Sequence, residues 1–328
     1  MATSYSGTLH NYAPRLTAFE FGLPNMAPKP HSILFIGGLT DGLYTVPYVQ
    51  TIAKALEPTE WSLFHLLLSS SYGGWGIGSL GQDVEEIGQC VEYVRKMKQA
   101  TSSGVATKVV IMGHSTGSQD VLHYVHAPNP LPLNPDVDGV QGLIRPVVDG
   151  AIMQAPVSDR QAMLPSVQGS SEGREAYEKL VEFARSQPAR SICPIELTGL
   201  VGLPPETPVN ARRFWSLASP ESPEKPAEDD LFSTDLADQR LDQTFGRVAQ
   251  RGLLRGTLVA LYSGSDEYAP EGVDKEGLLA RWKAATNAGG KKLWDDEASG
   301  VIPGASHNVR DEGQAWLIER IFSYLNRV

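Results

Sequence analysis

A run of apolar residues at 109–112, Val-Val-Ile-Met, leads directly into the pentapeptide Gly-His-Ser-Thr-Gly at 113–117. The run is typical of a short buried strand, and residues 119–125 have the apolar spacing of a helix. A Gly-x-Ser-x-Gly turn in this context holds its serine on a sharp bend with the hydroxyl exposed. The two glycines are needed because side chains there would clash with adjacent backbone. The pattern predicts that Ser115 is a nucleophile; the alternative is a plain strand-to-helix turn that contains a serine.

Strand and helix patterns alternate on both sides of this turn. An antiparallel hairpin is predicted near residues 8–19, and buried strands follow at 32–36, 61–68, 109–112, 147–154, 257–262 and 300–302. Helices are predicted between them at 46–56, 84–94, 119–125 and 276–286, with a last helix near 318–325. Such alternation indicates a mostly parallel sheet flanked by helices. With a nucleophile on the turn after a strand, the predicted fold is the α/β-hydrolase fold.

The alternation stops after the strand that ends at Gln154. The next hundred residues contain helical segments near 172–186 and 235–251, separated by an acidic, proline-rich loop. We therefore predict one α/β-hydrolase core domain made of residues 1–154 and 256–328, with a helical cap inserted at 155–255.

The charge balance disfavours some classes of partner. With 28 Lys and Arg against 38 Asp and Glu, the 328-residue chain has a formal net charge of −10, which disfavours nucleic acid and anionic membranes. Its two cysteines, Cys90 and Cys193, are too few for a disulfide framework and have no metal-ligand spacing. No secretory signal is readable, and the apolar runs are shorter than the roughly 18 residues of a spanning helix. We expect a soluble, cytoplasmic protein with no metal and no cofactor.

A serine hydroxyl is a poor nucleophile unless a histidine accepts its proton and a carboxylate orients that histidine. In this fold the three residues follow one another as serine, acid and histidine. Of the seven histidines, only His307 lies beyond the last predicted strand, in a loop of small residues before the final helix. His307 is therefore the predicted base. Packing or surface roles are expected for the other six: His10, His31, His65, His114, His123 and His126.

Three carboxylates are candidates for the acid. Asp266 follows the predicted strand at 257–262, on a loop that should reach the carboxyl edge of the sheet, and is our first choice. Asp159 follows the preceding strand, from which some members of the fold take their acid, and is the main competitor. Glu267 is the third candidate. For any one of them, the alternative is a solvated loop carboxylate.

An oxyanion that forms at an ester carbonyl needs two backbone N–H donors. One comes from the residue after the nucleophile, which is Thr116, and the other from the loop after the first parallel strand. That loop contains Gly37, Gly38 and Leu39, and we assign the second donor to Leu39, with Gly38 as the alternative. A phosphate-binding role for these glycines is disfavoured, because no Gly-Lys-Ser/Thr follows them.

Four aromatic residues are candidates for the substrate pocket. Tyr72 and Trp75 lie in a glycine-rich loop after the second parallel strand, and Phe214 and Trp215 lie in the predicted cap. The alternative for Trp75 is that it only anchors its loop, and the cap residues are equally open to a packing role.

Four longer runs are more specific than the Gly-x-Ser-x-Gly turn. They are Phe-Ile-Gly-Gly-Leu-Thr-Asp-Gly at 35–42, Ser-Ser-Ser-Tyr-Gly-Gly-Trp-Gly at 69–76, Gly-His-Ser-Thr-Gly-Ser-Gln-Asp at 113–120 and Gln-Ala-Pro-Val-Ser-Asp-Arg at 154–160. Together they resemble a fungal and plant α/β-hydrolase family that includes the fungal siderophore esterases, which cleave fusarinine C and triacetylfusarinine C inside the cell. The family's catalytic serine, acid and histidine would fall on Ser115, Asp266 and His307.

The resemblance implies an intracellular hydrolase of carboxylic esters with a fusarinine-type siderophore as substrate. Its partner would be a small-molecule ester, and any ferric ion would arrive bound to the hydroxamates of that substrate. A general carboxylesterase or lipase is the first alternative. A non-catalytic binding protein of the same fold is the second, although such proteins usually lack a member of the triad.

Overall fold

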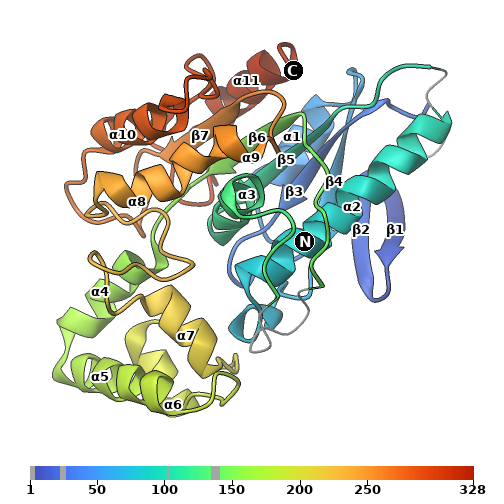
Figure 1. Ribbon diagram of the computed structural model, residues 1–328. Helices are drawn as coiled ribbons and strands as arrows, with labels where there is room; N and C mark the ends of the chain where they lie inside the picture. Colours follow the sequence, from blue (N-terminus) through green and yellow to red (C-terminus); the bar gives the residue numbers. More distant parts are fainter. Residues whose placement is uncertain (1–3, 23–26, 102–103, 134–140) are drawn as a thin grey trace.

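The computed structural model describes residues 4–22, 27–101, 104–133 and 141–328. Its centre is an eight-stranded sheet with the order β1-β2-β4-β3-β5-β6-β7-β8 (Figure 1). The strands are β1 (Gly7–Ala13), β2 (Leu16–Phe21), β3 (His31–Ile36), β4 (Trp61–Leu67), β5 (Val109–His114), β6 (Gly150–Gln154), β7 (Leu258–Ser263) and β8 (Gly300–Ile302). The pairs β1–β2 and β2–β4 are antiparallel, and every other neighbouring pair is parallel. The sheet is mostly parallel, as predicted.

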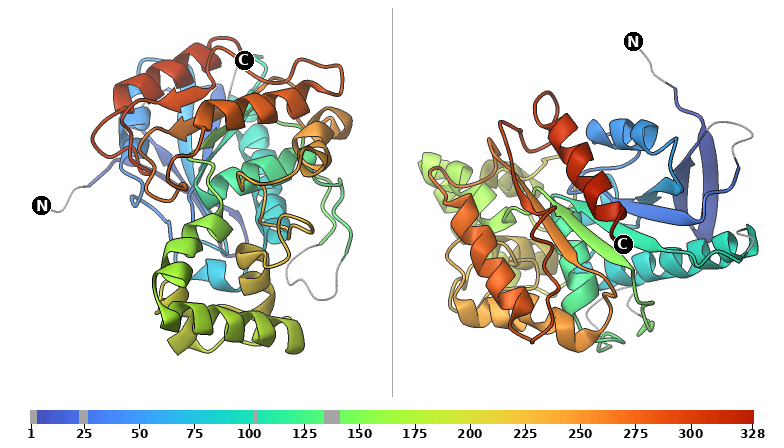
Figure 2. Two further views of the ribbon diagram at one scale, coloured as in Figure 1. Left: turned by 90° about the vertical axis from the view of Figure 1, so that its left-hand side faces the viewer. Right: turned by 90° about the horizontal axis from the view of Figure 1, so that it is seen from above.

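Helices cover both faces of this sheet (Figure 2). They are α1 (Tyr48–Ala55), α2 (Leu80–Thr101), α3 (Thr116–His126), α10 (Lys275–Asn287) and α11 (Gln314–Leu325). Because successive side chains of a strand point to opposite faces, β3 contributes Ile33 and Phe35 to the cluster under α1 and α11. Its other two core residues, Leu34 and Ile36, join the cluster under α2, α3 and α10.

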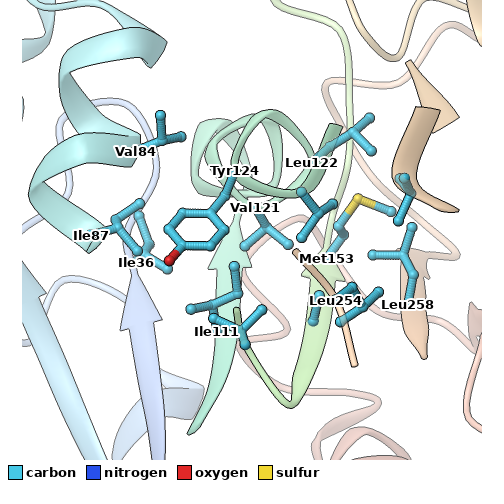
Figure 3. Packing of buried hydrophobic residues seen from close by; sticks show 14 of the residues in the cluster. Ile36, Val84, Ile87, Ile111, Val121, Leu122, Tyr124, Met153, Leu254 and Leu258 are labelled. Atoms are coloured by element: carbon cyan, nitrogen blue, oxygen red, sulfur yellow. The ribbon is translucent and has the colours of Figure 1, made fainter. Parts of the chain in front are cut away.

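The larger cluster fixes the helix that follows the predicted nucleophile. Val121 and Tyr124 of α3 pack with Ile111 of β5 and with Val84 and Ile87 of α2 (Figure 3). Burial of each such side chain contributes about 1.5–3 kcal/mol to the free energy of unfolding. The β5–α3 turn therefore lies between two elements that are firmly packed on the same core.

A separate lobe of helices follows β6 (Figure 1). It contains α4 (Asp159–Gly169), α5 (Ser171–Ser186), α6 (Ile195–Thr198), η2 (Gly199–Val201) and α7 (Ala211–Ala218). Its own hydrophobic cluster includes Leu180, Phe214 and Leu217, together with Trp75 from the loop after β4. Asn210 caps α7, because its Oδ1 accepts a hydrogen bond from the Arg213 N–H at 2.8 Å. Of this lobe, the sequence pattern predicted only α5 as a helix.

The last part of the predicted insertion packs differently from the lobe. The helix predicted near 235–251 is divided into α8 (Asp238–Gln243), η3 (Phe245–Arg247) and α9 (Val248–Arg251). Phe232, Phe245 and Val248 belong to the same cluster as α3 and α10. The insertion at 155–255 thus combines a lobe that has its own core with a segment that packs against α3 and α10. The predicted domain boundaries stay a prediction. Among the described residues, no helix has the length and apolar character needed to cross a membrane.

Candidate active site

Ser115 lies on the turn between β5 and α3 with φ 54° and ψ −122°, a backbone conformation that non-glycine residues rarely adopt. A Cβ at Gly113 would lie 1.9 Å from the carbonyl oxygen of Gly117, and one at Gly117 would lie 2.5 Å from that of Ile36. Gly113 is therefore required by the turn itself, and Gly117 by the close approach of the end of β3. The Ser115 N–H donates to the carbonyl oxygen of Gln154 at 2.9 Å, which ties the turn to β6.

The loop after β3 approaches this serine closely. A Cβ at Gly38 would lie 2.7 Å from the Cβ of Ser115. The Gly38 N–H donates to Oδ2 of Asp41 at 2.8 Å, so that donor is already engaged. Leu39 lines the same cavity as Ser115. Thr116 is the first residue of α3, where a backbone N–H has no acceptor within the helix. Leu39 and Thr116 stay the predicted pair of donors, and the engaged N–H makes Gly38 the less favourable alternative.

His307 and Asp266 are paired. Nδ1 of His307 lies 2.9 Å from Oδ2 and 3.0 Å from Oδ1 of Asp266, and the two side chains are buried. The loops that carry them are joined, because the Ser265 N–H donates to the Ala305 carbonyl oxygen at 2.8 Å. The ring of Tyr268 packs edge-on against the His307 ring, with 4.8 Å between ring centroids. The first-choice acid thus contacts the predicted base.

The two competing carboxylates have other contacts. Oε2 of Glu267 accepts a hydrogen bond from the backbone N–H of His307 at 2.8 Å, so Glu267 holds the loop and not the ring. Oδ2 of Asp159 accepts from Nε2 of Gln119 at 2.6 Å. Burial raises the pKa of Asp159 to about 6, against the opposing effect of the Gln119 hydrogen bond. Neither carboxylate replaces Asp266 beside the ring of His307.

Two further residues lie next to the pair: His114, for which a packing role was expected, and Gln154, which was not singled out from the sequence. The rings of His114 and His307 are tilted against each other, with 4.9 Å between their centroids. Burial, and after it the charge of His307, lowers the pKa of His114 to about 4. Gln154 accepts at Oε1 from the Tyr48 hydroxyl at 2.8 Å, and that same oxygen lies 2.6 Å from Nδ1 of His114. Its Nε2 donates to Oγ of Ser263 at 3.1 Å. In the sequence, the signal for this role of Gln154 is a glutamine at the end of an otherwise apolar strand.

A cavity of about 250 Å³ opens at Ser115. Its wall comes from the loop after β3, from β6–α4, from the segment after η2 and from the loops that carry the His307–Asp266 pair. The lining residues are Leu39, Thr40, Asp41, His114, Ser115, Val157, Asp159, Ala162, Met163, Gly202, Leu203, Pro204, Tyr268, His307 and Asn308. One cavity therefore contains the predicted nucleophile, the predicted base and Leu39, the predicted oxyanion donor.

The four aromatic candidates lie outside this wall. Trp75 and Phe214 are buried in the cluster of the lobe, so Trp75 anchors its loop. Tyr72 is 48% exposed, and its hydroxyl accepts from the Leu43 N–H at 3.0 Å. The guanidinium carbon of Arg185 lies 5.7 Å from the centroid of the Trp215 ring. The aliphatic side chains of Leu39, Met163 and Leu203 line the cavity instead.

The remaining histidines lie outside the cavity wall: His10, His31, His65, His123 and His126. Among the described residues, no group of three or more histidine, cysteine, aspartate or glutamate side chains is arranged to hold a metal ion.

Residues 1–326 match the family described as "Protein of unknown function (DUF1749)". The chain is 47% identical over 340 residues to "Fusarinine C esterase sidJ" of Aspergillus fumigatus, with 98% of this chain and 95% of that protein covered. Among solved structures, "Siderophore hydrolase EstB from Aspergillus fumigatus" is 45% identical with a TM-score of 0.86, and 99% of this chain and 98% of that chain are covered.

A more distant structure, "Alpha/Beta hydrolase fold protein of unknown function", is 14% identical with a TM-score of 0.56, covering 100% of this chain and 97% of that chain. At this identity the likeness concerns the fold alone. Together with the strand order, it confirms the predicted α/β-hydrolase fold.

Proposed function

We propose that this chain, which belongs to the DUF1749 family and is a carboxylic ester hydrolase of the α/β-hydrolase fold, cleaves fusarinine-type siderophore esters through an acyl-enzyme on Ser115. The family membership and the enzyme class confirm what the four sequence runs predicted. The observation that carries the catalytic proposal is that Ser115 lines one cavity with His307, whose ring is paired with Asp266.

In the first half of the proposed reaction, Oγ of Ser115 attacks the ester carbonyl carbon while Nε2 of His307 accepts the hydroxyl proton. Asp266 holds the proton on Nδ1 and stabilises the imidazolium that forms. The N–H groups of Leu39 and Thr116 donate to the oxyanion. The tetrahedral intermediate then collapses, the alcohol leaves with the proton from His307, and the acyl group stays on Ser115.

In the second half, a water molecule gives a proton to His307 and attacks the acyl carbon. The second tetrahedral intermediate expels Oγ of Ser115, which recovers its proton from the histidine. The products are an alcohol and a carboxylic acid. No step requires a metal ion from the protein; the ferric ion of a siderophore would be part of the substrate.

The substrate proposal draws on the two fungal relatives, whose names specify a fusarinine C esterase and a siderophore hydrolase at 47% and 45% identity. The cavity at Ser115, of about 250 Å³, suits the region around one ester bond, so the rest of a large substrate would extend out of it.

The direct test is to incubate the purified protein with ferric fusarinine C and with its triacetylated form, and to follow the products by chromatography and mass spectrometry. Ester cleavage that is lost in Ser115→Ala is the expected result. If both siderophores stay intact while a simple acyl ester is hydrolysed rapidly, a general carboxylesterase replaces this proposal. The apolar side chains of Leu39, Met163 and Leu203 in the cavity are the observation that favours that second candidate.

We also propose that the inserted residues at 155–255 act as a cap that selects the substrate, because Val157, Met163 and Leu203 all come from them and line the cavity. A cytoplasmic site of action is proposed from the two cysteines, Cys90 and Cys193, which are buried and unpaired. Fluorescence microscopy of the tagged protein in its own cells tests the location, and a secreted signal would contradict it.

A further inference from the structure

Gln154 contacts several segments of the catalytic edge through both ends of its side-chain amide. The side chain is fully buried at the end of β6. Its Nε2 lies 3.4 Å from the backbone carbonyl oxygen of His307 and 3.1 Å from Oγ of Ser263. Its Oε1 lies 2.8 Å from the Tyr48 hydroxyl and 2.6 Å from Nδ1 of His114. The amide therefore links the loop of the predicted base to the residue before the predicted nucleophile.

The chemistry of these contacts fixes the orientation of the amide. A backbone carbonyl oxygen only accepts hydrogen bonds, so the amide atom that faces the His307 carbonyl is the nitrogen, and Oε1 faces His114. An amide oxygen likewise only accepts. The Tyr48 hydroxyl and Nδ1 of His114 must therefore both donate to Oε1, and His114 carries a proton on Nδ1.

The second ring nitrogen of His114, Nε2, carries no proton when this histidine is neutral. Burial, and after it the charge of His307, lowers the pKa of His114 to about 4. Three groups oppose this shift: Asp41, whose Oδ2 lies 3.9 Å from Nε2, and the side-chain hydrogen bonds to Gln154 and Asn308. His114 is therefore neutral at pH 7, with its ring centroid 4.9 Å from that of His307.

We propose that Gln154 is a positioning residue for the base: its Oε1 holds His114 as the neutral Nδ1–H tautomer, and its Nε2 holds the main chain of His307 at the cavity. This inference rests on the proposed function, since it assigns a role within that reaction. The imidazolium of His307, which forms in both halves of the reaction, then has a neutral ring beside it and Asp266 as its charged partner. A protonated His114 would oppose that positive charge, because like charges at such a short separation repel.

The main chain of Gln154 supports the same role. Its carbonyl oxygen accepts from the Ser115 N–H at 2.9 Å and from the Ser118 hydroxyl at 2.8 Å. One residue thus holds the nucleophile by its main chain and the base by its side chain, which fixes the two loops relative to each other. A displacement of about 1 Å in such a geometry lowers a rate by roughly a hundredfold.

The first test removes the hydrogen bonds of the amide and keeps a side chain of similar length. Gln154→Met should lower kcat by about a hundredfold while KM stays within about threefold, because Gln154 does not line the cavity. The matched control is Gln161→Met. Gln161 is also a buried glutamine outside the cavity wall, and both ends of its amide bind Thr234, so kcat should stay within about threefold. Equal losses of kcat in the two variants, or a loss confined to KM, overturn the proposal.

The second test separates positioning from a merely structural role. In Gln154→Glu, a protonated carboxyl keeps both ends of the network, because its carbonyl oxygen accepts from Tyr48 and His114 while its O–H donates to the His307 carbonyl. An ionised carboxyl has no donor and places a negative oxygen against that carbonyl. Burial raises the pKa of a carboxyl. The ratio of kcat/KM between this variant and the wild type should therefore rise by about tenfold or more as the pH falls from 8 to 6.

The titratable groups around this position are Tyr48 from α1, His114 from β5 and His307 from its loop, with Asp41 and Asp266 next to the two histidines. Tyr48 and His114 keep their charge between pH 6 and pH 8, because burial raises the pKa of the Tyr48 hydroxyl well above its usual value and lowers that of His114 to about 4. A negative charge that acted only on the base would raise the pKa of His307 and make the ratio fall over the same range. A ratio that is flat or falls therefore overturns the proposal.

A measurement on the wild type keeps the proposal testable if these variants do not fold. Nitrogen-15 NMR of histidine-labelled protein distinguishes the two neutral tautomers of each ring. At pH 7 the ring of His114, assigned through its backbone resonances, should carry a proton on Nδ1 and none on Nε2. A proton on Nε2 overturns the proposal. This measurement needs no ester, so it is separate from the proposed function, which fails if the protein hydrolyses no ester and Ser115 does not react with a fluorophosphonate.

Discussion

The sheet edge and the α4–α7 lobe contribute different groups to the cavity at Ser115. From the sheet edge come the groups that would react or bind the oxyanion, and each is held by the backbone turn or loop that follows a strand. From the lobe and its first helix come Met163, Leu203 and Asp159, which could touch only the substrate. Changes at the edge should therefore affect all esters alike, whereas changes in the lobe should affect the choice among them.

The largest effect is expected at the edge. Ser115→Ala should lower kcat for every ester by about 10⁴-fold to 10⁶-fold, because no acyl-enzyme can form. Intact-mass measurement should show one fluorophosphonate adduct on the wild type and none on the variant. An undiminished adduct on Ser115→Ala would place the nucleophile elsewhere.

Asp159 and Asp266 follow the neighbouring strands β6 and β7, and variants of these two residues distinguish the lobe from the sheet edge most clearly. Asp266→Asn should lower kcat by about 10⁴-fold for every ester, because the paired carboxylate sets the tautomer and orientation of His307. Asp159→Asn should leave kcat within about tenfold of the wild type, because Asp159 contacts Gln119 and not His307. Glu267→Gln is the matched control, since Glu267 contacts only the backbone N–H of His307. A larger loss of kcat in a folded Asp159→Asn than in Asp266→Asn would make Asp159 the acid.

Some parts of the site depend on contacts between residues close in the sequence or on the order of the strands, and these parts could be predicted from the sequence. The β5–α3 turn needs Gly113 and Gly117 because of contacts within a few residues and with β3, and the order of strands puts Asp266 and His307 at one edge. The pairing of His307 with Asp266 follows the same order.

The wall of the pocket could not be predicted in this way. Which side chains of the lobe face the cavity depends on how α4 and α7 pack, and the sequence pattern predicted neither helix. Trp75 shows the consequence: an aromatic residue in a loop near the catalytic edge is buried against the lobe and does not line the cavity. The role of Gln154 also depends on three segments that meet only in the fold.

A smaller effect should distinguish the observed wall from the aromatic residues first expected there. Met163→Ala should change the ratio of kcat/KM between a short and a long acyl ester by about tenfold, because it removes apolar contact from the wall. Trp215→Ala, outside the wall, should leave that ratio within about twofold. Thermal unfolding of both variants checks that the lobe is intact. A change from Trp215→Ala as large as that from Met163→Ala would return Trp215 to the pocket.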